Sequence, residues 1–154
     1  MEWMDSLEAF IVRAKARTYV GDGAALPPCR AGAHDIGFEE GSWVYLDSYF
    51  GGTDFLGQEV VWHAGVPVWA MNYYGRIHRP EQIDAAAAGR VIKQALSALY
   101  SEGRFLGGFV FSKGPHTYID RSDGDVSSFT GHEVIEMERE TVYRLDYHGG
   151  MIRA

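Results

Sequence analysis

Residues 42–75 carry the clearest pattern of hydrophobic and polar positions in the chain. Hydrophobic and polar residues alternate over three runs, which are separated by Gly51-Gly52-Thr53-Asp54 and Ala64-Gly65. Alternation with a period of two is typical of strands, and short breaks that contain glycine are typical of hairpin turns. We therefore expect three antiparallel strands joined by two tight turns.

The register of these turns divides the predicted ribbon into two faces, because successive side chains of a strand point to opposite sides. We expect Phe50 to pair with Phe55 and His63 to pair with Val66. One face is then mainly aliphatic and suited to the core, and it carries Val44, Leu46, Ser48, Phe50, Phe55, Gly57, Glu59, Val61, Val66, Val68, Ala70 and Asn72. The other face is aromatic and amphipathic, and it carries Trp43, Tyr45, Asp47, Tyr49, Leu56, Gln58, Val60, Trp62, Trp69, Met71 and Tyr73.

Helices and further strands are predicted on both sides of this ribbon. Apolar residues at helical spacing predict a first helix over residues 4–16 and a central helix from Pro80 to about Tyr100. Residues 20–33 are rich in Gly, Ala and Pro, which indicates a loop or lid. Strands are expected over residues 34–39, 116–121, 126–137 and 141–147, with turns at Asp123-Gly124 and Arg139-Glu140.

This order of elements predicts one α+β domain over residues 1–154. We expect a twisted antiparallel sheet with the N-terminal helix and the central helix on one face, packed on the aliphatic side of the ribbon. The two halves share their order of elements, but no repeat of residues is evident, and we infer no duplication. No separate DNA-binding domain is expected.

Composition excludes several classes of function. The net charge is −7 and the Lys and Arg residues are scattered, which argues against a nucleic-acid partner. The single cysteine, Cys29, fits a reducing compartment, so we expect a cytoplasmic protein. No apolar run reaches the roughly 20 residues of a membrane-spanning helix, so no membrane partner is expected.

Glu59 is the first candidate for chemistry. The expected register places it on the aliphatic face, where burial would raise the pKa of its carboxyl group towards the range of a general acid or base. Asn72 lies on the same face as a hydrogen-bond donor to it. The alternative is a strand-end glutamate that reaches solvent or pairs with a Lys or Arg side chain, and a register shift of one residue would move Glu59 to the aromatic face.

The aromatic face is the second candidate. Asp47 and Gln58 are expected to lie opposite each other, as placed polar groups within an aromatic wall. The predicted ligand-binding residues are Trp43, Tyr45, Asp47, Tyr49, Gln58, Trp62, Trp69 and Tyr73. The same face also fits a second core layer or a homodimer interface.

A third constellation lies in the second β region. With the expected turns, two histidines lie opposite Gly131 beside a pair of carboxylates, and such side chains are ordinary ligands of divalent metals. The four residues are His116, Glu133, Asp146 and His148. A polar patch at the end of the sheet explains them better, so we expect no metal and no cofactor, and the usual nucleotide-binding and hydrolase motifs are absent from the sequence.

Several motifs together resemble an uncharacterised bacterial domain family. They are Tyr19-Val-Gly-Asp-Gly-Ala24, residues 41–51 and 67–75, Phe55-Leu-Gly-Gln-Glu59, Phe129-Thr-Gly-His-Glu133 and His148-Gly-Gly150. Members of that family look like stand-alone proteins or the C-terminal part of proteins that open with a phage-repressor-like helix-turn-helix. The resemblance implies an intact domain and assigns no reaction. By analogy, a domain behind a DNA-binding module is often a ligand sensor.

Three functions follow from these observations. The first is a cytoplasmic small-molecule-binding domain whose ligand lies on the aromatic face, partly covered by residues 20–33. The second is a cofactor-independent acid–base enzyme with Glu59 as the proton-transfer group, Asn72 as its orienting partner and His116 or His148 as a second titrating group. The third is a homodimeric interaction module.

Overall fold

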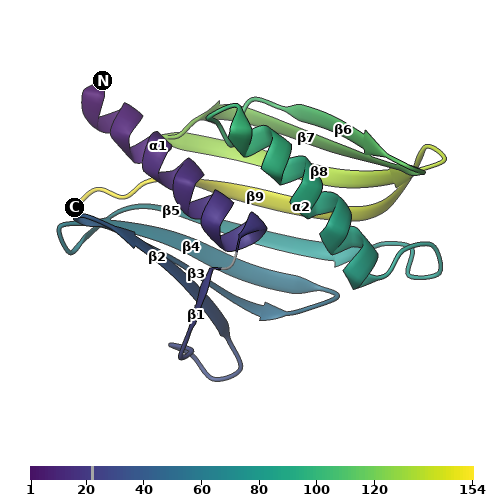
Figure 1. The fold of residues 1–154 in the computed structure, drawn as a ribbon, viewed down its shortest axis with the longest axis horizontal. Coiled ribbons are helices and arrows are strands. Elements are labelled where there is room, and N and C mark those ends of the chain that lie inside the picture. Colours follow the sequence, from purple (N-terminus) through teal and green to yellow (C-terminus); the bar gives the residue numbers. More distant parts are fainter. Residues whose placement is uncertain (22) are drawn as a thin grey trace.

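Both helices lie against one face of a curved antiparallel sheet (Figure 1). The computed structural model describes residues 1–21 and 23–154. The strands of these residues form a single sheet in the order β1-β2-β3-β4-β5-β9-β8-β7-β6, and all paired neighbours are antiparallel. The predicted α+β class, with an N-terminal and a central helix on one face, is confirmed.

The strands form two consecutive meanders that meet at β5 and β9. The bounds are β1 Ala24–Leu26, β2 His34–Glu40, β3 Trp43–Gly51, β4 Phe55–His63, β5 Val66–Ile77, β6 Phe109–Lys113, β7 His116–Asp125, β8 Ser128–Met137 and β9 Glu140–Met151. The edge strands β1 and β6 were not predicted. β1 lies within the expected loop over residues 20–33, and Asp22 of that loop is outside the described residues.

The helices follow the predicted apolar stripes. α1 spans Glu2–Lys15 and continues into a π-helical turn, Ala16–Val20. α2 spans Ala85–Ser101 and begins later than Pro80, because a side-chain oxygen of Asp84 accepts a hydrogen bond from the Ala87 backbone N–H at 2.7 Å and caps the helix. No helix among the described residues is long and apolar enough to cross a membrane.

The predicted pairing of β3 with β4 is wrong by one residue. Gly51 still belongs to β3 and pairs with Phe55, so Phe50 pairs with Leu56. Gly51 has a φ of +88°, and a Cβ atom at this position would lie 2.1 Å from the Asp54 carbonyl oxygen. Only glycine allows this closure, and it exchanges the two faces of β4 relative to the expectation.

A second one-residue shift follows in the next hairpin. His63 pairs with Val66 as predicted, but a bulge between Val61 and Trp62 then brings Val61 opposite Trp69. A bulge adds one residue to one strand and reverses the faces beyond it. The residues of β5 beyond the bulge therefore share a face with Glu59, and Trp69, Met71 and Tyr73 are buried there.

We call the side of the sheet covered by α1 and α2 the inner face, and the opposite side the outer face. Trp43, Tyr45, Asp47 and Tyr49 of β3 lie on the inner face, with Phe55, Gly57, Glu59 and Val61 of β4. The aromatic positions of β3 and β5 thus face the helices, and the prediction that the helices cover the aliphatic face is wrong. The core lies between this face and the helices and includes Leu7, Phe10, Ile11, Ala14, Val91, Ala95 and Leu99.

The second β region also has a different register from the one expected. β7 and β8 are joined at Val126-Ser127 rather than at Asp123-Gly124, and Asp125 pairs with Ser128. Gly131 consequently lies opposite Ser122 and Tyr147, and not opposite two histidines.

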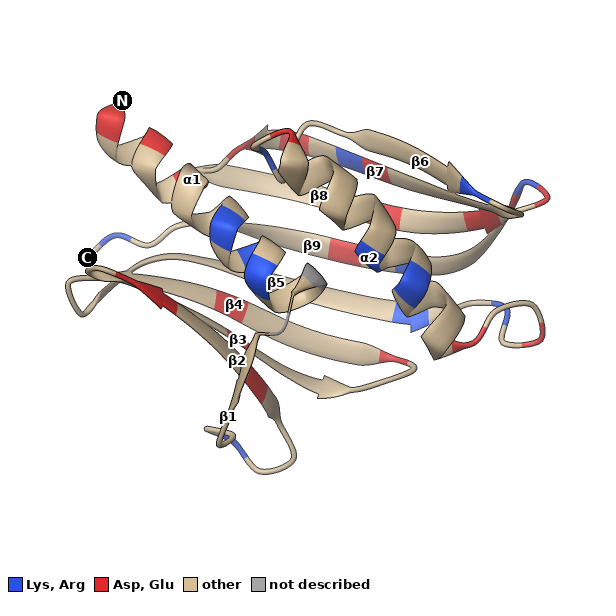
Figure 2. Cartoon of the chain, in the orientation of Figure 1, with Lys and Arg blue, Asp and Glu red and all other residues tan. Residues whose placement is uncertain are grey.

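Charged residues are distributed over many elements of the molecule. Figure 2 shows Lys and Arg on both helices, on strands and in loops, and acidic residues within strands beneath the helices. Several of the acidic residues within the strands are buried, which makes them candidates for a functional site.

Candidate functional site

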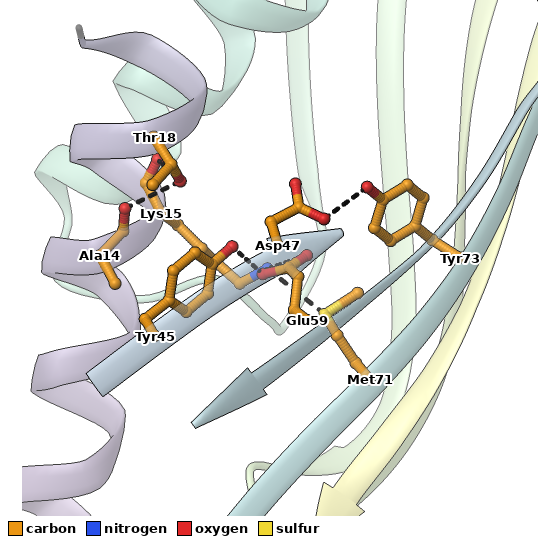
Figure 3. A network of polar contacts seen from close by, with 8 residues as sticks. All are labelled: Ala14, Lys15, Thr18, Tyr45, Asp47, Glu59, Met71 and Tyr73. Atoms are coloured by element: carbon orange, nitrogen blue, oxygen red, sulfur yellow. Dashed lines mark hydrogen bonds and ion pairs between the residues drawn. The ribbon is translucent and has the colours of Figure 1, made fainter. Parts of the chain in front are cut away.

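A buried ion pair joins α1 to β4 (Figure 3). The Nζ atom of Lys15 lies 2.8 Å and 3.1 Å from the two carboxylate oxygens of Glu59, and the two side chains are 5% and 1% exposed. The Tyr45 hydroxyl donates to Oε1 of Glu59 at 2.5 Å. Burying an isolated charge in the core costs free energy. The ion pair and the hydrogen bond from the Tyr45 hydroxyl offset that cost for Lys15 and Glu59.

Aromatic side chains surround the ammonium group of Lys15. Its Nζ atom lies 5.2 Å from the ring centre of Phe105, 5.9 Å from that of Tyr19 and 6.0 Å from that of Trp69. These distances fall within the range of cation–π attraction. The core of the protein is therefore built to hold an ammonium ion between a carboxylate and aromatic rings.

Asp47 is the cross-strand neighbour of Glu59 and belongs to the same network. Its Oδ1 atom accepts a hydrogen bond from the Tyr73 hydroxyl at 2.7 Å, as Figure 3 shows. Burial and the negative charge of Glu59 raise the pKa of Asp47 to about 7. We call Tyr45, Asp47, Glu59 and Tyr73 the N-terminal carboxylate network.

A matching group of residues lies in the second meander. Glu133 accepts hydrogen bonds from the hydroxyls of Tyr118 and, at 3.0 Å, Tyr143, while Asp120 accepts one from Tyr147 at 2.8 Å. Burial raises the pKa of Glu133 to about 7, with a contribution from the charge of Asp120. Burial likewise raises the pKa of Asp120 to about 6. We call Tyr118, Asp120, Glu133 and Tyr147 the C-terminal carboxylate network.

The two networks correspond residue by residue. Tyr45-Leu-Asp47 on β3 matches Tyr118-Ile-Asp120 on β7, and Gly57-Gln-Glu59 on β4 matches Gly131-His-Glu133 on β8. In each half the aspartate lies directly opposite the glutamate, and the glycine lies opposite the tyrosine of the last strand. Each half also has its bulge two residues after the glutamate. The inner face therefore carries the same arrangement twice.

A cavity of about 260 Å³ separates α2 from the inner face. Its polar walls include Glu59, Asp120 and Glu133, and its apolar walls include Ile92 and Leu96 of α2. Further tyrosines that line it are Tyr19, Tyr73, Tyr100, Tyr118, Tyr143 and Tyr147. Apolar walls with a few placed polar groups are the usual construction of a small-molecule site.

The cavity opens beside the N-terminal half of α2. Lining residues at that end are exposed, namely Ala85 and Lys93 on the helix and Gly52 and Thr53 in the turn between β3 and β4. The carboxylates at the other end are buried. A ligand that enters between the helix and this turn meets the carboxylates at the bottom of the cavity.

The site lies within a recognised family domain. Residues 47–152, more than half of the chain, match the family described as "Domain of unknown function (DUF5680)". The chain belongs to the DUF5680 family. No curated protein and no solved structure shows significant similarity to it. The DUF5680 region includes Asp47, Glu59 and the whole C-terminal carboxylate network, whereas Lys15 and Tyr45 precede it.

The structure of this DUF5680 protein divides the predicted ligand-binding residues into three groups. Tyr73 lines the cavity, and Tyr45 and Asp47 belong to the network behind it. Trp43 and Trp69 pack in the core under the helices, and Tyr49 stacks on His34. Gln58 and Trp62 lie on the outer face, because the faces of β4 are exchanged.

The predicted pairing of Glu59 with Asn72 is wrong. Glu59 is buried on the inner face, while Asn72 is exposed on the outer face and contacts Gln58 and His148. The helices α1 and α2 lie over the inner face, which carries the aromatic positions of β3 and β5.

The metal hypothesis has no geometric basis in the structure. Glu133 is buried on the inner face, Asp146 and His148 are exposed on the outer face, and His116 pairs with Met137 at the far end of β7. Within residues 1–21 and 23–154, no group of three or more His, Cys, Asp or Glu side chains is placed to hold a metal ion.

Sequence reasoning overlooked Lys15, Asp120 and the tyrosines of the second meander. Lys15 follows an apolar stripe and looks like an ordinary helix-end charge. The two matched motifs, Tyr-x-Asp followed by Gly-x-Glu, are visible in the sequence and would have pointed to Asp120 and Glu133 together. They are hard to notice because the turns between them differ in length.

Proposed function

We propose that this DUF5680 protein is a cytoplasmic small-molecule-binding domain whose ligand lies in the cavity between α2 and the inner face. The main observation that supports this proposal is the cavity. Protein interiors are packed as densely as organic crystals, and an opening of about 260 Å³ that leads from the surface to buried carboxylates is a departure from that rule. Its apolar walls and buried hydrogen-bonding groups suit an organic ligand better than water alone.

The cellular setting of the proposal rests on sequence arguments. A single cysteine and a negative net charge fit a cytoplasmic protein that does not bind nucleic acid by itself. The resemblance to bacterial domains that follow a helix-turn-helix fits a ligand sensor, by analogy only.

A thermal-shift screen with a library of small metabolites tests this function. A ligand that binds the folded state alone, at about 100 times its Kd, adds about 2.7 kcal/mol to the free energy of unfolding. We expect at least one compound to raise the Tm of the wild-type protein. The stabilisation should disappear when the cavity is filled.

Gly89→Phe is the variant that fills it. Gly89 lines the cavity on α2, and a Cβ atom built there has no neighbour within 4 Å, so a side chain can begin at this position without a clash. Ser97→Phe, on the exposed side of the same helix, is the control and should respond to ligands like the wild type. Ligands that stabilise Gly89→Phe as much as the wild type would place the binding site elsewhere.

An acid–base enzyme is the second candidate. The pKa values of Asp47, Asp120 and Glu133, raised by burial to between about 6 and about 7, favour it, because such groups exchange protons readily near neutral pH. Incubation of a ligand from the screen with the protein, followed by mass spectrometry, separates the two functions. A ligand that is recovered unchanged indicates a binding domain, whereas conversion that stops in Glu133→Gln indicates an enzyme.

A further inference from the structure

The two carboxylate networks differ in one respect, which is the presence of a cation. Glu59 of the N-terminal network holds the ammonium group of Lys15. No Lys, Arg or His side chain in the described part of the chain lies within ion-pair distance of Asp120 or Glu133. The same arrangement is therefore paired with a cation in one half and not in the other.

Asp120 also has an unused acceptor. Its side chain is 4% exposed, and its Oδ2 atom has no hydrogen-bond partner among the described residues. Asp120 lines the cavity directly opposite Glu133 on the neighbouring strand. Buried polar atoms in proteins nearly always have partners, so an unpaired carboxylate oxygen at a cavity wall points to a group that is supplied from outside the chain.

The balance of buried charge leads to the same conclusion. The buried charged residues of the described chain around the inner face are four carboxyl groups, Asp47, Glu59, Asp120 and Glu133, and a single cation, Lys15. Tyrosine hydroxyls and the more distant charges of Lys15 and Arg104 offset part of the cost of burying the remaining carboxylates, but burial still raises the pKa values of these groups. A cation in the cavity would pair with them and relieve that cost.

We propose that the ligand is an organic cation, a mainly apolar molecule with one protonated amine that binds Asp120 and Glu133 as Lys15 binds Glu59. This inference rests on the proposed function. The amine donates to Oδ2 of Asp120, and Glu133 supplies the second negative charge. Tyr118, Tyr143 and Tyr147 line the same cavity, so aromatic rings are available to the amine as they are to Lys15.

Other classes of ligand fit these observations less well. An anion would face three carboxylates in the cavity walls, because Lys15 is already paired and Lys93, the other lysine at the cavity, lies at its exposed mouth. A divalent metal needs several ligands converging on one point, and the described side chains offer no such group. A neutral molecule could donate a hydrogen bond to Oδ2 of Asp120 but would leave the negative charges of Asp120 and Glu133 without a cation.

Cavity volume limits the size of the cation. A cavity of about 150 Å³ is enough for benzene, so about 260 Å³ accommodates a two-ring system with a short side chain. Tryptamine, which joins an indole to an ethylammonium group, has this size and charge. Tryptophol and indole-3-acetate keep the ring and replace the ammonium by a neutral hydroxyl and an anionic carboxylate.

Isothermal titration with these three probes tests the inference. At pH 8 the carboxyl groups of Asp120 and Glu133 are ionised, because that pH is above the pKa values of about 6 and about 7 that burial gives them. We expect tryptamine at millimolar concentration to bind, tryptophol to bind at least about tenfold more weakly, and indole-3-acetate to give no measurable binding.

The substitution Asp120→Asn tests whether the carboxylate of Asp120 is the group that binds the amine. The substitution keeps the size of the side chain and an oxygen that accepts from Tyr147, so the fold should be retained. Tryptamine should lose about tenfold or more in affinity, while tryptophol should be unaffected. Asp123→Asn, an exposed aspartate on the same strand, removes an equal charge and serves as the control with wild-type affinity. Glu133→Gln should weaken tryptamine in the same direction as Asp120→Asn.

Three results would overturn the inference. Equal binding of tryptamine and tryptophol would show that the cavity does not select a cation, and the binding function would stand if Gly89→Phe abolished both. Failure of tryptamine to bind, or equal affinity in wild type and Asp120→Asn, would remove the cation site. The library screen with Gly89→Phe and Ser97→Phe decides the proposed function separately.

Discussion

At the scale of single residues, the structure depends on one buried ammonium group. Lys15 is the only buried cation in the described chain, and it pairs with Glu59 between α1 and β4. Arg13, two residues earlier on the same helix, pairs with Glu40 at 2.6 Å, and both side chains of this pair are almost half exposed. The two pairs allow a direct comparison of a buried and a surface ion pair.

Lys15→Met should destabilise the protein by about 3–5 kcal/mol, because it leaves the Glu59 carboxylate buried without its cation. Arg13→Met should cost less than about 1 kcal/mol. Urea unfolding at pH 7 measures both values. Adding Glu59→Gln to Lys15→Met should recover part of the loss, since no unpaired charge is then left in the core. Equal costs for the two single variants would contradict this account of the network.

The buried carboxyl groups also predict the pH dependence of stability. Burial raises the pKa of Asp120 to about 6 and that of Glu133 to about 7, while burial and the charge of Glu59 raise that of Asp47 to about 7. A group with a higher pKa in the folded protein binds its proton more tightly there than in the unfolded chain. The free energy of unfolding therefore decreases as the pH rises from about 4, the ordinary value, to about 7.

The ligand-free protein should consequently have a Tm several degrees higher at pH 5 than at pH 8. Differential scanning calorimetry across this range measures the effect. In Asp120→Asn the Tm should change less between pH 5 and pH 8, because one of the three carboxyl groups with a raised pKa is gone. A Tm that increases steadily from pH 5 to pH 8 would show that these carboxyl groups are not desolvated.

At the scale of elements, the periodicity of hydrophobic residues predicts most of the helices and strands but does not predict how the strands are aligned with one another. The helices and the strands β2 to β5 and β7 to β9 have alternating or helical patterns and were all predicted, although α2 begins later than expected and the turn between β7 and β8 lies three residues further on. The edge strands β1 and β6 are short, at three and five residues, and carry little pattern. The register depends on the φ of Gly51 and on a bulge at Val61, and neither leaves a clear mark in the pattern of hydrophobic residues.

The candidate site was predicted only in part, because its geometry depends on the same strand register. Asp47, Tyr45 and Tyr73 were correctly predicted to share a face, because the two one-residue shifts cancel between β3 and β5. Glu59 was correctly predicted to be buried on the side that the helices cover, but it was grouped with the aliphatic positions of β3 and β5, because both shifts act on β4. The ion pair of Glu59 with Lys15 joins elements that are far apart in the sequence, and no local pattern indicates such a contact.

The repeated glycines of β4 and β8 give a prediction about these elements. A Cβ atom at Gly57 would lie 2.3 Å from the Tyr73 hydroxyl oxygen, and one at Gly131 would lie 2.3 Å from that of Tyr147. Gly57→Ala and Gly131→Ala should each cost about 1–3 kcal/mol, because the tyrosine must move away from its aspartate. Gly52→Ala, where a Cβ atom has no neighbour within 4 Å, should change stability by less than about 0.5 kcal/mol in the same chemical denaturation. If all three variants were equally stable, the packing of tyrosine over glycine would not hold the networks in place.

At the scale of the whole molecule, the two meanders form one body. β5 pairs with β9 along nine residues, and Trp69 of the first meander packs against Phe129 of the second, with ring centres 5.9 Å apart. The cavity takes its carboxylates from both halves and its opposite wall from α2. A site shared in this way requires the halves to stay together.

Unfolding should accordingly occur in one step. All four tryptophans precede residue 70, so tryptophan fluorescence reports on the first half, whereas far-UV circular dichroism reports on the whole chain. The two signals should give the same transition midpoint in urea. A fluorescence transition that is separate from the dichroism transition would mean that the halves unfold independently.

The most direct test of the account is a crystal structure of the protein with tryptamine at pH 8. We expect the indole ring in the cavity under α2, with the ammonium nitrogen at hydrogen-bond distance from Oδ2 of Asp120 and near Glu133. Tryptamine bound on the outer face of the sheet, or an empty cavity beside a fully occupied site elsewhere, would contradict it.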